Sequence, residues 1–205
     1  MKIVVLSSLA LKGAPENGKA QFEQALGAPL ELHFDATHAI LPRLAAGFRA
    51  DLVVLTAEAM KDLTMSEVRT LGASGVGVAV KAGAYRPEIG TVDAFKRALE
   101  SASSVAHSKV GASGIYFAEL VEKLPIRLKK RIVVEKGPVG LVVARGEAEI
   151  GLQQICELEP VPGIDIVGPL PAPIQRMTHF AGGIPTNAVN PDGGRALLTR
   201  LPVIA

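Results

Sequence analysis

The segment Ser108–Leu120, SKVGASGIYFAEL, places two serines and two glycines directly before a helical pattern of apolar residues. A serine hydroxyl can cap the free backbone N–H groups of such a helix start, and glycine eases the entry turn. The same hydroxyls and N–H groups, together with the positive end of the helix dipole, can also hold an anion. The segment by itself therefore leaves two interpretations open, ordinary capping and anion binding.

Small or polar residues also follow three other predicted strands, at Ser7-Ser8, Thr37-His38 and Gln153-Gln154. In an open α/β sheet, ligands bind beyond the C-terminal ends of the strands, where helices begin. The regular placement of four such junctions favours anion binding over capping. The residues expected to bind the ligand are Ser7, Ser8, Thr37, His38, Ser108, Ser113, Gly114 and Gln153.

Two of the junction residues could also do acid–base chemistry. The imidazoles of His38 and His107 titrate near neutral pH, so either could be the catalytic base if the protein is an enzyme. His107 has a structural interpretation as well, as a hydrogen-bonded histidine within a strand. The sequence contains no phosphate-binding loop and no cluster with metal-ligand spacing, so we predict neither a metal nor a cofactor. The single Cys156 lies in the apolar segment GLQQICEL, which is typical of a buried, inert thiol.

The elements that must position these residues alternate between short Val- and Ile-rich runs and helical patterns, which predicts an α/β fold with mostly parallel sheets flanked by helices. Thr91 and Asn190 are expected to cap helices, the second with Pro191 at the first helical position. The predicted strands are residues 2–7, 30–36, 50–56, 75–83, 103–108, a run ending near 154, and 162–171. The predicted helices are 19–26, 37–47, 57–63, one after Thr91, 114–124, one ending near 146, and one after Asn190.

Two stretches of the chain could cross between lobes, one after residue 81 and a stiff, Pro-rich one at Gly168–Gln175. This arrangement predicts a discontinuous lobe of residues 1–81 plus 176–205 and a second lobe of residues 82–175. The ligand is expected between the two lobes.

The composition narrows the classes of partner. The net charge of +2 comes from 22 basic and 20 acidic residues, and two Tyr with no Trp leave little aromatic surface for stacking on bases, so we expect no nucleic-acid binding. No apolar run approaches the roughly twenty residues of a membrane helix, so no membrane insertion is expected. The N-terminus lacks a signal-peptide cleavage site, which predicts a cytoplasmic protein, or a periplasmic one if an export signal has been removed.

The order of several motifs resembles the molybdate-binding-protein-like branch of the type II periplasmic solute-binding proteins. The matching segments are VVLSSLALKGA, LAAGFRADLVVLTAEAMKDL, EIGTVDAFKRAL with SVAHSKVGASGIYFAELVEKL, then ARGEAEIGLQQICEL and VGPLP. The resemblance implies a two-lobed type II periplasmic-binding-protein-like fold that closes over an oxyanion held by serine hydroxyls and helix-start amides. It places the first ligand serine at Ser8, with Ser7 beside it, and the helix-start amides at Ser113 and Gly114.

The chain departs from this family at two positions. Thr37 and His38 stand where the family has a serine-rich loop, and Leu152–Gln154 stand where a tyrosine often closes the molybdate pocket. A tight pocket of hydroxyl and amide donors suits a tetrahedral dianion, whereas this more varied donor set suits a carboxylate at least as well.

Two functions of different classes follow from the resemblance. The first is a solute-binding protein that closes on a small anion, either a molybdate-like oxyanion or a small organic carboxylate, as the receptor of an ABC transporter with a membrane component as its partner. The alternative is a cofactor-independent isomerase of an unsaturated tricarboxylate such as aconitate, with His38 or His107 as the base.

Overall fold

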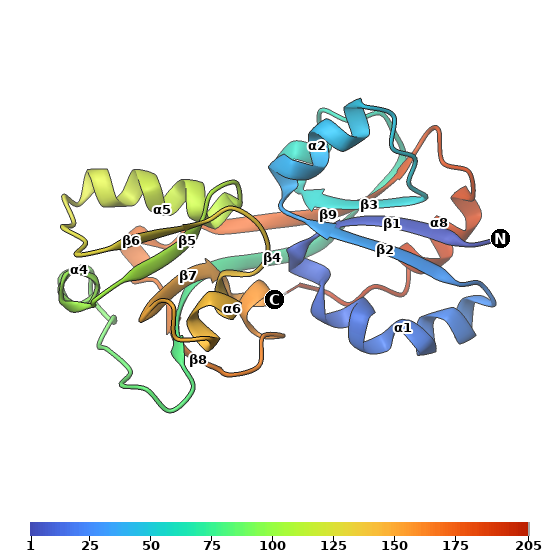
Figure 1. Cartoon of the computed structure of the whole chain (residues 1–205). Helices are drawn as coiled ribbons and strands as arrows, with labels where there is room; N and C mark the ends of the chain where they lie inside the picture. Colours follow the sequence, from blue (N-terminus) through green and yellow to red (C-terminus); the bar gives the residue numbers. More distant parts are fainter. Residues whose placement is uncertain (205) are drawn as a thin grey trace. The chain divides into compact units, whose positions relative to one another are not determined.

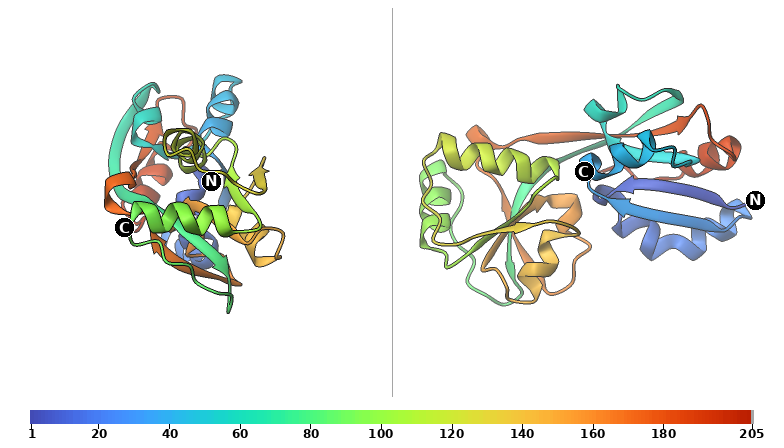
Figure 2. Two further views of the ribbon diagram at one scale, coloured as in Figure 1. Left: turned by 90° about the vertical axis from the view of Figure 1, so that its left-hand side faces the viewer. Right: turned by 45° about the horizontal axis from the view of Figure 1, so that its top comes forward.

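The computed structural model describes residues 1–204, apart from the side chains of residues 14–17. The chain forms two compact units: unit 1 contains Met1–Ala73 and the stretch from Thr178 onward, and unit 2 contains Ser74–Met177. Both boundaries fall inside strands, β4 (Met65–Lys81) and β9 (Met177–Pro185) (Figures 1 and 2). The lobe boundaries expected from the sequence, 1–81 plus 176–205 and 82–175, stay a prediction.

Unit 1 contains a sheet in the strand order β2-β1-β3-β9. The strands β1 (Ile3–Ser8), β2 (Leu30–Asp35) and β3 (Leu52–Thr56) are parallel, and β9 joins β3 in the antiparallel direction. The register pairs Ser8 with Asp35 and Ser7 with Val54. The C-terminal ends of all three parallel strands therefore lie at one edge of this sheet.

Helices cover both faces of the unit 1 sheet. One face packs against α2 (Thr37–Ala45) and α3 (Ala57–Met60), where Leu6, Ile40 and Met60 belong to one buried cluster. The opposite face packs against α8 (Pro191–Leu198). The closeness of the helix is evident at Gly182 of β9, where an added Cβ would lie 2.4 Å from Leu198 Cδ1. The helix α1 (Gly13–Leu26) contacts α8 and β2, and the short 3-10 helix η1 (Leu9–Leu11) follows β1.

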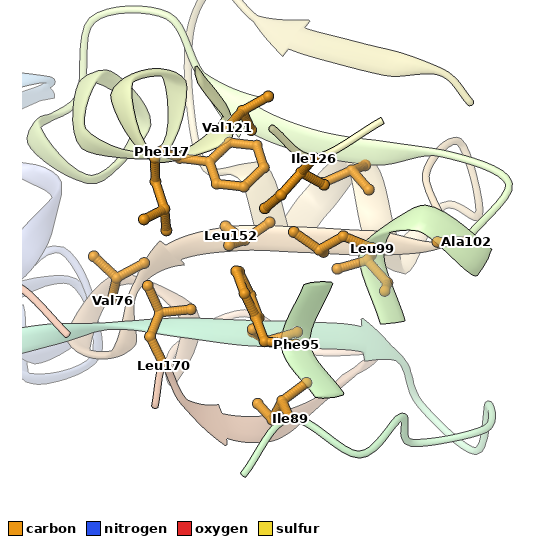
Figure 3. Packing of buried hydrophobic residues seen from close by; sticks show 14 of the residues in the cluster. Val76, Ile89, Phe95, Leu99, Ala102, Phe117, Val121, Ile126, Leu152 and Leu170 are labelled. Atoms are coloured by element: carbon orange, nitrogen blue, oxygen red, sulfur yellow. The ribbon is translucent and has the colours of Figure 1, made fainter. Parts of the chain in front are cut away.

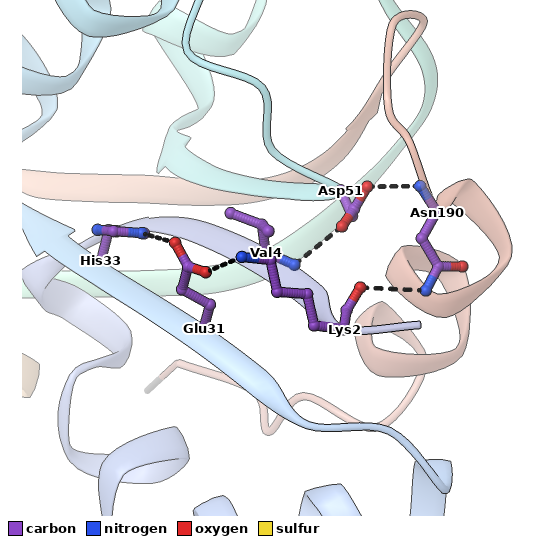
Figure 4. Close-up of polar contacts among 6 residues, drawn as sticks. All are labelled: Lys2, Val4, Glu31, His33, Asp51 and Asn190. Carbon is purple, nitrogen blue, oxygen red and sulfur yellow. Dashed lines mark hydrogen bonds and ion pairs between the residues drawn. The ribbon is translucent and has the colours of Figure 1, made fainter.

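A buried carboxylate joins separate segments of unit 1. Asp51 is only 2% exposed, and its two oxygens accept hydrogen bonds from the backbone nitrogens of Val4 at 2.8 Å and Asn190 at 2.6 Å (Figure 4). The side chain of Asn190 then donates to Lys2 O and accepts from Gly193 N, which caps α8. These bonds fasten the first strand to the last helix. On the neighbouring strand, Glu31 accepts a hydrogen bond from Lys2 and pairs with His33 (Figure 4).

Unit 2 contains a mixed sheet whose parallel strands are β5 (Val105–Ser108), β6 (Arg131–Val134) and β7 (Ile150–Gln154). The strand β4 pairs with β7 on one side and with β8 (Ile164–Pro169) on the other, both in the antiparallel direction. The parallel strands again end at one edge, and three helices begin there: α5 (Ala112–Lys123), α6 (Val139–Ala144) and α7 (Ile155–Leu158).

The two faces of the unit 2 sheet carry separate cores. On one face, Phe95 and Leu99 of α4 (Val92–Ser101) and Phe117 of α5 pack against Leu152 and the valines of β4 (Figure 3). On the other face, Val139 and Val143 of α6 pack against Ala106. Adjacent side chains of β5 point to opposite faces of the sheet, as in any β-strand. A short 3-10 helix, η2 (Ala172–Ile174), lies in the Pro-rich stretch before β9.

The α/β fold class predicted from the sequence is confirmed. The predicted caps are confirmed as well, since Thr91 Oγ1 accepts from Ala94 N at 3.1 Å and Asn190 Oδ1 accepts from Gly193 N at 3.0 Å. The expectation that Pro15, Asn17 and Gly18 interrupt the helical stretch before residues 19–26 is wrong. The helix α1 is continuous, because the first backbone N–H groups of a helix need no intrahelical acceptor and a proline is tolerated there. The strands β6 and β9 and the first ten residues of β4 were not predicted.

Candidate functional site

The C-terminal edge of the unit 1 sheet presents a buried hydroxyl with no partner. Ser8 ends β1 and is 2% exposed, and among the described residues its Oγ atom is the buried side-chain polar atom that has no hydrogen bond. The neighbouring hydroxyl of Ser7 is satisfied, because Ser7 Oγ donates to Ser8 O at 2.8 Å. A buried polar group left unpaired costs about 1–3 kcal/mol, so such a group requires an explanation. A ligand that accepts a hydrogen bond from Ser8 provides one.

Thr37 and His38 lie at the same edge, at the start of α2. Thr37 is 5% exposed and is the first residue of the helix, whereas the side chain of His38 is exposed. The residue before them, Ala36, provides no side-chain cap, and Ala36 N donates to the carboxylate of Asp35 at 2.9 Å. The first backbone N–H groups of α2 therefore need hydrogen-bond acceptors from outside the helix, as in any helix without a capping side chain.

The corresponding edge of unit 2 contains Ser108, Ser113 and Gly114. Ser108 acts as a cap for the turn before α5, because its Oγ accepts from Gly111 N at 2.9 Å. Ser113 and Gly114 are buried in the first turn of α5. A Cβ at Gly114 would lie 1.9 Å from Ser108 O, so only glycine lets the helix start approach the end of β5 this closely. The capping interpretation therefore holds for Ser108, whereas the side chain of Ser113 takes no part in that cap. Anion binding by this segment stays a prediction.

His107 is enclosed by its own chain. It is 3% exposed, its Nδ1 lies 2.9 Å from Ser108 O, and Arg131 Nε donates to its Nε2 at 2.7 Å. This pattern assigns the proton to Nδ1 and leaves the ring neutral, with its free lone pair facing the guanidinium. Burial, and next the positive charge of Arg131, lower the pKa of His107 below its usual value. In this geometry neither ring nitrogen is open to a ligand.

Gln153 connects the end of β7 to two other groups. Its Oε1 accepts from the backbone nitrogen of Val139 at 2.7 Å, at the start of α6, and its side chain is also hydrogen-bonded to Glu157. Since the carbonyl oxygen is occupied by Val139, the amide NH2 group is the donor to the Glu157 carboxylate. Gln154 is buried and also has an interaction partner. Gln153 therefore contacts Val139 and Glu157, and it also lies at the C-terminal edge of the unit 2 sheet.

The carboxyl of Glu157 was missed by the sequence analysis. Glu157 lies three residues after the end of β7 and is partly buried, and burial raises its pKa to about 7, although the hydrogen bond from Gln153 acts in the opposite direction. Its position in the sequence could have identified it, because a titratable residue shortly after a parallel strand is a candidate catalytic or binding residue. Cys156 itself is buried, and burial raises the pKa of its thiol to about 12, as expected of an unreactive cysteine.

The structure thus gathers Ser7, Ser8, Thr37 and His38 at the C-terminal edge of one sheet, and Ser108, Ser113, Gly114 and Gln153 at that of the other. Within the described part of the chain, no group of three His, Cys, Asp or Glu side chains is placed to hold a metal ion. No helix among the described residues has the length and apolar character needed to cross a membrane.

Comparisons with known proteins identify relatives of the whole chain. Residues 3–201 match the family described as bacterial extracellular solute-binding protein. The chain is 38% identical over 214 residues to a protein named aconitate isomerase from a Pseudomonas species, an alignment covering 97% of this chain and 81% of that relative.

Solved structures show the same fold at low sequence identity. The periplasmic molybdate-binding protein of Azotobacter vinelandii has a TM-score of 0.77 at 13% identity, over 98% of this chain and 92% of that one. The substrate-binding domain of a molybdenum ABC transporter from Clostridium difficile has a TM-score of 0.66 at 14% identity, over 98% and 91%. The fold is therefore that of the two-lobed type II periplasmic binding proteins, and the family resemblance inferred from the sequence motifs is confirmed. The chain belongs to the bacterial extracellular solute-binding protein family.

Proposed function

We propose that this solute-binding protein binds a small polycarboxylate anion, using hydroxyl and backbone N–H donors at the C-terminal edges of its parallel strands. The observation that carries the proposal is the buried, unpartnered hydroxyl of Ser8. A carboxylate oxygen would accept its hydrogen bond, and hydrogen bonds to charged acceptors are stronger than neutral ones. Within unit 2, the start of α5, with Ser113 and Gly114, presents donors of the same kind, supported by the helix dipole.

Two observations favour a carboxylate over molybdate. The tyrosine that often closes the molybdate pocket in the resembling family is replaced by Leu152–Gln154. In addition, the relative at 38% identity carries the name of an enzyme for a tricarboxylate, aconitate. The ligand class proposed is thus an organic di- or tricarboxylate, with molybdate as the competing outcome.

A second candidate is an isomerase acting on an unsaturated tricarboxylate such as aconitate. The match to a protein named aconitate isomerase along nearly the whole chain specifically favours it. The reaction moves one proton between two carbon atoms and needs a general base, together with donors that stabilise the dienolate formed between the two transfers. The hydroxyl and amide donors described above suit the carboxylates of such a substrate in both its ground state and its charged intermediate.

A thermal-shift series tests the binding proposal. The purified protein is heated with molybdate, tungstate, sulfate, phosphate, citrate, tricarballylate and both isomers of aconitate, because a ligand that binds only the folded state raises Tm. A rise with tricarboxylates and none with the inorganic oxyanions supports the proposal, whereas a rise with molybdate alone contradicts it. The ¹H NMR spectrum of cis-aconitate incubated with the protein then separates a binder from an isomerase, since only the isomerase forms the trans isomer faster than buffer does.

We propose the membrane component of an ABC transporter as the protein partner of a solute receptor of this kind. Support comes from the family, whose description is extracellular, and from a structural relative titled as a domain of such a transporter. Cell fractionation tests this assignment first, because a receptor for import must face the periplasm, whereas a cytoplasmic protein cannot deliver an external solute.

A further inference from the structure

The imidazole of His107 connects three elements of unit 2. It lies on β5, one residue before the end of the strand, and is buried. Arg131 of β6 donates a hydrogen bond to its Nε2 at 2.7 Å, and its Nδ1 lies 2.9 Å from Ser108 O. The ring also packs against Phe117 of α5, with ring centroids 5.3 Å apart. His107 therefore contacts the neighbouring strand, the end of its own strand and the helix that follows it.

Arg131 determines which nitrogen of this ring carries the proton. A guanidinium has hydrogen-bond donors and no acceptor, so Nε2 of His107 must offer its lone pair to Arg131. The proton of the neutral ring is then on Nδ1, which donates it to Ser108 O. In the absence of the guanidinium the proton is free to move to Nε2, and Ser108 O then loses this donor.

The carbonyl group of Ser108 lies against the first turn of α5. A Cβ at Gly114 would lie 1.9 Å from Ser108 O, so the helix start and this carbonyl group are in direct contact. The hydroxyl of the same serine accepts from Gly111 N at 2.9 Å, just before the helix. Ser108 thus holds the start of α5 with both its carbonyl group and its side chain. The orientation of its peptide group therefore sets the position of the first turn.

The first turn of α5 presents free donors. Ser113 is buried, and its hydroxyl makes no hydrogen bond to any of the described residues. The backbone nitrogens of Gly114 and Ile115 both donate to Gly111 O, whereas those of Ala112 and Ser113 precede the first intrahelical bonds. These donors are the ones that the proposed function assigns to the anion within unit 2. Their usefulness to a ligand depends on their exact position, because hydrogen bonds weaken steeply with poor alignment.

On the basis of the binding function proposed above, we propose that Arg131 and His107 are positioning residues for the anion site at the start of α5. Arg131 fixes the tautomer of the imidazole, and the Nδ1–H group of His107 holds the carbonyl group of Ser108. Ser108 in turn holds the first turn of α5, where the donors of Ser113 lie. His107 acts without touching the ligand, because both of its ring nitrogens are engaged within the chain.

The polar ring supplies something that an apolar side chain lacks. A leucine or phenylalanine at position 107 would fill the space beside Phe117 without burying two polar atoms that need partners. The charge of Arg131 also opposes protonation of the ring, and with burial it lowers the pKa of His107. The arrangement keeps the imidazole neutral, with one donor directed at Ser108 O.

The binding test compares Arg131→Met with Lys130→Met. Both changes remove one positive charge from exposed neighbouring positions, so a general loss of attraction for an anion affects both equally. Isothermal titration calorimetry with trans-aconitate is expected to give a Kd about fivefold or more higher for Arg131→Met, and a Kd near that of the wild type for Lys130→Met. Arg131→Lys keeps a donor for Nε2 and is expected to recover most of the affinity. Thermal denaturation shows that each variant is folded at the titration temperature.

The tautomer itself is measured by long-range ¹H–¹⁵N NMR of the histidine rings. The signals of His107 are assigned by their absence from His107→Asn. They should show the proton on Nδ1 in the wild type and in Arg131→Lys, and on Nε2 for a large part of the molecules in Arg131→Met. A role in stability alone predicts no such change.

The outcomes separate the two levels of the proposal. If the wild type binds trans-aconitate, and Arg131→Met binds it with the same Kd as Lys130→Met, the positioning role is overturned while the binding function stands. The same tautomer in the wild type and in Arg131→Met also overturns it. If the wild type binds no polycarboxylate, the binding function fails and the positioning role fails with it. A higher Kd in Arg131→Met that Arg131→Lys reverses, together with the change of tautomer, supports both.

Discussion

The side-chain oxygen of Gln153 lies 2.7 Å from the backbone nitrogen of Val139, which connects the end of β7 to the start of α6. Replacement of Gln153 by Leu should lower the free energy of unfolding by about 1–3 kcal/mol, because it leaves a buried amide N–H without an acceptor. It should also raise the pKa of Glu157 further, since the hydrogen bond from Gln153 opposes the effect of burial. Urea denaturation measures the first effect, and an unfolding free energy equal to that of the wild type would contradict the structure.

Glu157→Gln should stabilise the protein at high pH. The pKa of Glu157 in the folded state, about 7, exceeds its ordinary value of 4.5, so the folded state binds more protons than the unfolded state between these limits. The contribution of this residue to stability is therefore present below about pH 4.5 and lost as the pH rises through 7. The variant should match the wild type near pH 4.5 and exceed it at pH 8 in the free energy of unfolding from urea denaturation. A variant less stable than the wild type at pH 8 would contradict this account.

His107 should affect stability with the opposite sign. Its pKa is lowered by burial and by Arg131, so in the window just below its ordinary value of 6.5 the unfolded state binds more protons, and stability is lost as the pH falls. His107→Gln should weaken the fall in unfolding free energy between pH 7.5 and 5.5. The comparison is made in the Glu157→Gln background, because Glu157 titrates in an overlapping window. The same slope with and without His107 would rule out this assignment.

Gly114 should be intolerant of a side chain. A Cβ there would lie 1.9 Å from Ser108 O, so Gly114→Ala should destabilise the protein by about 1–3 kcal/mol or more through displacement of the start of α5. Gly90 in the same unit is the matched control, since a Cβ there meets no atom within 4 Å. Thermal denaturation of the two variants compares them directly, and equal Tm values would show that the close approach at Gly114 is not needed.

Local patterns in the sequence were sufficient to predict most of the fold. Strands with buried Val- and Ile-rich runs, such as β1 and β3, and helices with a capping side chain, such as α4 and α8, were recognised because the stabilising groups are near in sequence. The missed strand segments lack this signal. The first half of β4 is mostly exposed, and β6 begins at Arg131, the last residue of the basic stretch RLKKR. The strand β9 contains Gly182 and Gly183, which have no side chains. These segments are strands because of their partners, which a local pattern does not contain.

The candidate site was predictable only in part for a similar reason. The positions of Ser8, Thr37 and Ser113 at strand ends follow from the order of the elements. Whether a hydroxyl is satisfied, as in Ser7 and Ser108, or left unpartnered, as in Ser8, depends on atoms brought together by folding. The pairing of His107 with Arg131 and the burial of Glu157 likewise arise from tertiary contacts.

The most direct test of the account concerns Ser8, with Ser7 as the matched control. Because Ser8 Oγ is buried without a partner, Ser8→Ala should leave the unliganded protein as stable as the wild type or more stable, whereas Ser7→Ala loses a bond of about 1 kcal/mol. Isothermal titration calorimetry with trans-aconitate should show that Ser8→Ala raises Kd by about tenfold or more, equivalent to about 1.4 kcal/mol. A Kd for Ser8→Ala equal to that of the wild type, together with a loss of stability like that of Ser7→Ala, would contradict the claim that Ser8 binds the ligand.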